Sequence, residues 1–128
     1  MRSLQPNIGA VPMVAPAVHT GNNTGAATDL LGFESACLVV NTGAVAGDGD
    51  FSIKLQESDT TTAGDFADVA AEHLTGTVPA TLEAASVYRL GYIGHRRYLR
   101  TVLTRNGGTS LALGAVLVKG HPAEVPVT

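Results

Sequence analysis

The chain has little cysteine, few aromatic residues and little charge. Its 128 residues include one cysteine and no tryptophan, with 5% aromatic and 15% charged residues. A lone Cys37 excludes a disulfide within the chain and a cysteine cluster for zinc or iron. The charged fraction is well below the roughly 25% usual in soluble proteins. Together with 45% hydrophobic residues, it excludes intrinsic disorder and suggests that some surface is hidden in an assembly.

The sequence also lacks a long apolar run. No stretch reaches the roughly 18 continuous apolar residues of a membrane-spanning helix. Pro6, Pro12 and Pro16 interrupt the apolar N-terminal segment, which a secretory signal would not tolerate well. The formal net charge of −3 gives the whole molecule no attraction to nucleic acid or to an anionic membrane. We therefore expect a soluble single domain with neither of these partners.

The first 28 residues differ from the rest of the chain. They contain three prolines and three glycines, almost no charge, and apolar residues at no helical or strand period. We interpret residues 1–28 as an extended arm, residues 29–122 as the folded domain and residues 123–128 as a tail. The arm is too apolar for water, so Ile8, Val11, Met13 and Val14 are expected to dock either on the protein's own body or on a neighbouring subunit. A loose terminus fits the composition equally well.

After residue 28 the pattern is that of an all-β protein. Residues 50–58 (DFSIKLQES) alternate cleanly between apolar and polar, and residues 106–109 (NGGT) form a hairpin turn signal. Residues 67–74 could form two helical turns or a loop that crosses the sandwich. The expected fold is a single antiparallel β-sandwich, jelly-roll-like, with one short helix at most. Five runs are expected to be strands: 33–41, 50–58, 87–93, 98–105 and 110–119.

No motif for catalysis, metal or cofactor binding is present. The four histidines are far apart in sequence, and none has a metal-ligand spacing to another ligand. The turn Gly47-Asp48-Gly49-Asp50 offers two carboxylates but lacks the other ligands of a calcium loop. The chain contains neither a phosphate-binding loop nor a nucleophile elbow. We therefore expect no catalytic residue, no metal, no cofactor and no enzymatic activity.

Charge is distributed unevenly along the chain. Residues 48–83 contain eight acids and one lysine, a sum of −7, whereas residues 89–105 contain five arginines and no acid, a sum of +5. The arginines could contact the acidic segment within the molecule or between subunits, or could form a nucleic-acid patch. The first interpretation is favoured because eight nearby acids would repel phosphate. Arg96, Arg97 and Arg100 are the predicted polar contact residues, although a solvated strand edge would contain the same residues.

Four segments of the sequence resemble a family of small virion proteins of tailed bacteriophages and prophages. The resemblance covers about Phe33 to Pro126, so the arm lies outside it. The segments are FSIKLQESD (51–59), DFADV (65–69), GYIGHRRYLR (91–100) and GHP (120–122).

The resemblance implies a capsid cement or decoration protein. Such a protein binds the major capsid protein on the outside of the assembled head, often as a homotrimer, after synthesis in the host cytoplasm. The sequence leaves two alternatives open. One is a head-to-tail connector or tail component, and the other, from a different class, is a carbohydrate-binding β-sandwich built on exposed tyrosines.

Overall fold

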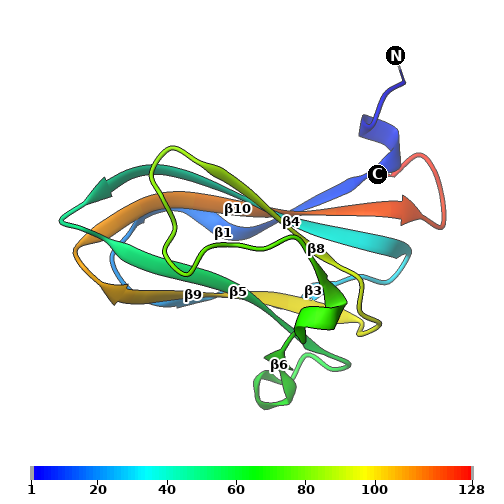
Figure 1. Cartoon of the computed structure of the whole chain (residues 1–128). Coiled ribbons are helices and arrows are strands. Elements are labelled where there is room, and N and C mark those ends of the chain that lie inside the picture. Colours follow the sequence, from blue (N-terminus) through cyan, green and yellow to red (C-terminus); the bar gives the residue numbers. More distant parts are fainter. Residues whose placement is uncertain (1, 128) are drawn as a thin grey trace.

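The computed structural model describes residues 2–127 and consists of strands joined by turns. Two antiparallel sheets pack face to face (Figure 1). The first sheet has the order β1-β10-β4-β8-β7, and the second has the order β2-β9-β5-β6, with β3 also paired to β9. In residues 2–127, helical structure is limited to 3-10 turns of three residues, and no helix is long and apolar enough to cross a membrane. The all-β antiparallel sandwich predicted from sequence is confirmed.

The strand bounds follow the hydrophobic runs of the sequence closely, with extensions. β4 continues five residues past its predicted end, to Ala46, which shortens the expected glycine-rich turn. The strands are β1 Gly9–His19, β2 Asn23–Thr24, β3 Thr28–Asp29, β4 Phe33–Ala46, β5 Asp50–Ser58, β6 Ala67–Asp68, β7 Leu74–Thr75, β8 Val87–Tyr92, β9 Tyr98–Gly107 and β10 Ser110–Pro122. The 3-10 turns are η1 Gln5–Asn7, η2 Ala63–Asp65 and η3 Ala71–His73.

The stretch interpreted as an arm contributes an edge strand to the first sheet. β1 pairs with β10 from Gly9 to His19, and the ladder shifts register twice, on either side of Val14. Proline is tolerated in an edge strand because the outer side of the strand needs no ladder hydrogen bonds, and the shifts interrupt the alternation of side chains. This explains why the segment shows no strand period in sequence. Residues 9–19 therefore lie on the protein's own body.

The core lies between the two sheets and consists mainly of leucine. Leu38 of β4 and Leu117 of β10 from the first sheet are fully buried, as are Leu99 and Leu103 of β9 from the second. Phe51 of β5 is also fully buried, which agrees with the inward side of the predicted alternation. Both sheets therefore contribute fully buried apolar side chains to one shared core.

One side of the sandwich is closed by the segment between β7 and β8. Leu82 inserts its side chain into the core, and its amide donates a hydrogen bond to the Phe51 carbonyl of the second sheet at 2.9 Å. The Ala85 amide donates to the Gly43 carbonyl of the first sheet, also at 2.9 Å. The crossing predicted for residues 67–74 runs from β6 of the second sheet through the 3-10 turn η3 to β7 of the first sheet. The segment ties the edges of the two sheets together.

The two hairpin tips at one end pack directly on each other through glycine. Gly108 has a φ of +70°, and a Cβ atom there would lie 2.2 Å from the Asp48 carbonyl oxygen of the neighbouring tip. Only glycine fits at this position. At the opposite end both termini lie close together (Figure 1), and the Val127 amide donates to the Pro6 carbonyl at 2.8 Å.

Candidate interaction surfaces

The outer face of the first sheet is apolar at its centre. In β10, buried Leu113, Ala115 and Leu117 point into the core, and the residues between them point outward and are also small or apolar. We call this outer surface the apolar face. It consists of Pro12, Pro16 and Val18 of β1, Ala112, Gly114 and Val116 of β10, and Val39, Asn41 and Gly43 of β4. Among the described residues that continue these rows onto β8, Arg89 is the one that carries a charge.

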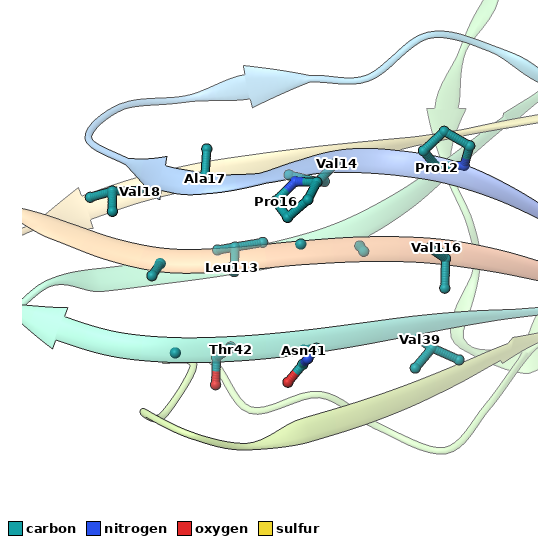
Figure 2. Close-up of a pocket in the computed structure, with 14 residues that line it drawn as sticks. Pro12, Val14, Pro16, Ala17, Val18, Val39, Asn41, Thr42, Leu113 and Val116 are labelled. Atoms are coloured by element: carbon teal, nitrogen blue, oxygen red, sulfur yellow. The ribbon is translucent and has the colours of Figure 1, made fainter.

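The apolar face has a hollow and a ridge. A groove of about 690 Å³ runs over it, and its floor is formed where Ala112, Gly114 and Gly43 supply little or no side chain. Beside the floor, Val116 remains 41% exposed and is paired across the strands with Val39 and Pro12. Figure 2 shows these three residues at one end of the groove, Val18 at the other, and Pro16 and Asn41 between them.

The outer face of the second sheet is polar and internally paired. We call it the charged face and define it by Lys54 and Gln56 of β5, Asp68 of β6 and Arg100 of β9. Lys54 Nζ lies 3.0 Å from an Asp68 oxygen, and Gln56 donates to Asp68 at 2.9 Å and accepts from Arg100 at 2.8 Å. The hydrogen bond from Gln56, followed by the one from Lys54, lowers the pKa of Asp68. The Arg100 guanidinium also lies over the Phe66 ring, 4.4 Å from its centre.

The adjacent arginines pair with acids of the same chain. Arg97 makes two hydrogen bonds to the Asp29 carboxylate, at 2.9 and 2.8 Å, and this pairing holds the pKa of Asp29 at about 2. Arg96 forms an ion pair with Asp59. Asp59 belongs to the acidic segment defined in the sequence, so the contact between the two charged segments occurs within the molecule at this point. Asp29 precedes that segment, and the sequence did not single it out.

A tyrosine hydroxyl joins the two sheets beside Arg96. Tyr92 of β8 is buried, and its hydroxyl donates to Glu57 of β5 at 2.6 Å and accepts from the Arg96 amide at 3.0 Å. Burial, followed by the hydrogen bond to Glu57, raises the pKa of Tyr92. The hydroxyl therefore stays protonated and acts as a fixed donor at the end of the sandwich.

The predicted interface residues lie in three environments. Met13 and Val14 are 6% and 2% exposed and belong to the protein's own core. Ile8 and Val11 are half-buried at β1 and the residue before it. Arg96 and Arg97 are exposed and ion-paired, whereas Arg100 lies on the charged face.

Sequence reasoning did not single out the apolar face. The signal was available in residues 110–119 (SLALGAVLVK), which are apolar on both sides, whereas residues 50–58 alternate with polar side chains. A strand that is apolar on both sides is typical of a sheet covered on both faces.

The remaining chemistry-bearing groups that the structure describes form no complete site. Within residues 2–127 no group of three or more histidine, cysteine or acidic residues could hold a metal ion. His73 and His95 approach edge to face, with ring centres 5.9 Å apart, and His73 Nδ1 is buried without a hydrogen-bond partner in the described part of the chain. Ser35 Oγ lies 2.8 Å from His121 Nδ1 on the exposed surface, but no described carboxylate hydrogen-bonds to this histidine. The hydroxyl and imidazole therefore lack the orienting acid of a nucleophilic triad.

No protein-family model matches the sequence, and no curated protein matches it. The structure is similar to the crystal structure of the SPBc2 prophage-derived protein YomS, with a TM-score of 0.51 and 12% identity over 88% of this chain and 93% of that one. At this identity the similarity concerns the fold. A chain in the structure of the infectious bursal disease virus Gx strain gives a TM-score of 0.45 and 14% identity, over 93% of this chain and 35% of that chain, which is too weak to support a conclusion.

Proposed function

We propose that the protein is a structural component of a phage virion that binds the outer surface of the assembled head as a cement protein. The observation that carries the proposal is the pair of outer faces, one apolar and one charged, on a sandwich without a complete catalytic constellation in its described residues. A protein that works only by binding needs such surfaces and no reactive centre. The fold shared with a prophage-derived protein is consistent with this role.

The mechanism is stabilisation by mass action. Each copy that binds the assembled shell, and not its free subunits, adds its binding free energy to the assembled state. The partner is the major capsid protein, and we assign the contact to the charged face, where Lys54 is exposed to solvent and Arg100 is half-buried. Repetition of this contact over a shell makes weak individual binding sufficient.

The test is co-sedimentation of the purified protein with empty heads of the cognate major capsid protein, followed by thermal melting of the heads. The expected result is saturable binding and a higher melting temperature. Arg100→Ala should weaken binding, whereas Arg89→Ala, an exposed arginine on the other sheet, should not. Failure of the wild-type protein to sediment with heads would overturn the proposal.

The two alternatives from the sequence make different demands. A connector or tail component would form a ring, which a mass in solution would reveal. A carbohydrate-binding module needs an exposed platform of aromatic rings. Tyr92 is in the core and the Tyr88 hydroxyl accepts a hydrogen bond from the Glu83 amide, so neither ring is offered freely to a sugar.

The resemblance implies a trimer, which differs from the twofold dimer that we infer below from the shape of the apolar face. Light scattering of the purified protein tests it directly, because three copies of the 13.1 kDa chain differ clearly from one or two.

A further inference from the structure

We infer that the apolar face is the interface of a twofold-symmetric dimer, in which the first sheets of two copies of this chain pack face to face. The inference stands on the shape and composition of this face and is independent of the proposed role in a virion.

The middle strand of the apolar face is apolar on both sides. In β10 the inward residues Leu113 and Leu117 alternate with outward Ala112 and Val116, so both sides are apolar. In β5 of the other sheet, the outward positions are polar, including Lys54 and Gln56. The low charged fraction of the chain, 15%, also indicates that part of the surface is covered, because a covered surface needs few charges.

The residues of the apolar face are arranged in three rows that run across the strands. The pairing registers place Pro12, Val116 and Val39 in one row. In another row Val18 pairs with Ala112, and Ala112 lies beside Gly43, its Cβ 3.2 Å from where a glycine Cβ would stand. Between them lies a middle row in which Gly114 pairs with Asn41 and Pro16 packs against Gly114, with its Cβ 3.0 Å from where a glycine Cβ would stand. The first row is the ridge (Figure 2). In the third row Ala112 and Gly43 form part of the floor of the groove, and Val18, which is 66% exposed, stands beside them.

A twofold axis that lies in the interface along the middle row matches the positions of the ridge and the groove. It places the ridge of each copy over the third row of its partner, so Val116 of one copy meets Ala112 of the other, and Val39 meets Gly43. Self-complementarity of this kind is the requirement of an isologous interface. The strands of the two copies are then nearly antiparallel, which is within the range seen for packed sheets.

The same axis leaves the few polar groups of this sheet either paired or in solvent. Asn41 lies on the axis row and meets Asn41 of the second copy, where the two side-chain amides can hydrogen-bond to each other. Arg89 lies on β8, next to the apolar face, where it pairs with Val39 and continues the ridge row. Its charge therefore stays at the rim and is not desolvated.

The available area is sufficient for a specific dimer. The three strands of the apolar face and the neighbouring β8, about 4.8 Å apart and about eight residues long at 3.3 Å per residue, cover roughly 500 Å² in projection. Two such faces hide roughly 1,000 Å², at the lower end of the range for specific interfaces. We therefore expect a dimer of moderate affinity, with a dissociation constant in the micromolar range.

The first test is the mass of the purified full-length protein by light scattering over a concentration series up to about 100 μM. The expected mass at high concentration is twice that of the 13.1 kDa chain. Val116→Asp should raise the dissociation constant at least 10-fold, because it buries an unpaired carboxylate at each ridge. Val102→Asp, the matched change on the outer side of the second sheet, should leave the dimer intact. A monomer at all concentrations, or a trimer, would overturn the inference.

The second test does not depend on weakening the dimer. Asn41→Cys in a Cys37→Ser background places a single thiol on the axis row, and a short bifunctional maleimide should link two copies in high yield. Thr104→Cys in the same background, on the outer side of the second sheet, should not be linked. Circular dichroism and thermal melting confirm that each variant is folded. Equal cross-linking of both variants would contradict the twofold arrangement even if the mass is that of a dimer.

Discussion

The outer faces of the two sheets differ, although the inner faces are alike. Toward the core, β10 contributes Leu113 and Leu117 and β9 contributes Leu99 and Leu103, all buried. Toward the outside, β10 contributes Ala112, Gly114 and Val116, whereas β9 and β5 contribute Arg100, Lys54 and Gln56. The inner faces are constrained by the need for one shared core, and the outer faces are free to differ.

This difference separates residues that hold the fold from residues that meet a partner. An outward leucine or valine adds nothing to the stability of a monomer, because it stays in water. A paired outward charge adds little, because solvent screens it. The residues of each outer face therefore indicate what that face contacts. Substitutions on the inner faces should change stability much more than substitutions on the outer faces.

The largest expected effect is on the shared core. Leu103→Ala in the second sheet and Leu117→Ala in the first should each lower the free energy of unfolding by about 3 kcal/mol, because both fully buried side chains leave cavities. Urea unfolding at one protein concentration measures both. A loss below about 1 kcal/mol for only one of them would mean that the sheets do not share the core equally.

The strands that alternate or that end in clear turns could be predicted from the sequence. β5 was predicted with its bounds because Phe51, Ile53 and Leu55 point inward between polar neighbours. The hairpin between β9 and β10 was predicted because Asn106 and the two following glycines favour a tight turn. These signals are local, so no knowledge of the rest of the chain was required.

β1 and the apolar face could not be predicted in the same way. The two register shifts on either side of Val14 remove the strand period, so Met13 and Val14 were interpreted as residues of an arm that docks on the protein's own body or on a neighbouring subunit. The groove depends on Ala112 and Gly43, which are far apart in sequence and meet only through the pairing of β10 with β4. Such a surface exists only after the strands have their order and register.

The next largest effect should come from the hydroxyl that joins the sheets. Tyr92→Phe removes a donor to Glu57 and an acceptor for the Arg96 amide, and should lower the free energy of unfolding by about 2 kcal/mol, since one partner is charged. Tyr98→Phe is the control, because its hydroxyl makes no hydrogen bond within residues 2–127, and should change stability by under about 0.5 kcal/mol. Equal effects of the two substitutions would show that the hydroxyl bridge does not stabilise the junction of the sheets.

A smaller effect is expected at Asp29, where Arg97 stabilises the carboxylate. The pKa is about 2 in the folded protein against an ordinary 3.8, so the carboxylate contributes stability above about pH 4. This contribution is lost as the pH falls through about 2, because the unfolded chain takes up the proton first. Asp29→Asn should remove that pH dependence and lower stability at pH 7 by at most about 1 kcal/mol, since both side chains are nearly half exposed, at 42% and 47%.

The matched variant for this ion pair is Arg97→Gln. It should reproduce the loss, and the double substitution should add little to either one, because both remove the same interaction. Additive losses, or a slope between pH 4 and pH 2 that persists in Asp29→Asn, would show that the pairing with Arg97 does not cause the low pKa.

The smallest effect belongs to the charged face itself. Lys54 and Asp68 form an ion pair with both side chains largely in solvent, at 48% and 62% exposure. A double-mutant cycle with Lys54→Met and Asp68→Asn should give a coupling of about 0.2–1 kcal/mol that shrinks as salt is added. Val116→Asp on the opposite face should raise the dissociation constant of the dimer at least 10-fold, whereas loss of this ion pair should change the free energy of unfolding by at most about 1 kcal/mol. If the ion pair instead contributes several kcal/mol, the charged face supports the fold, and the contrast between the two outer faces would have to be abandoned.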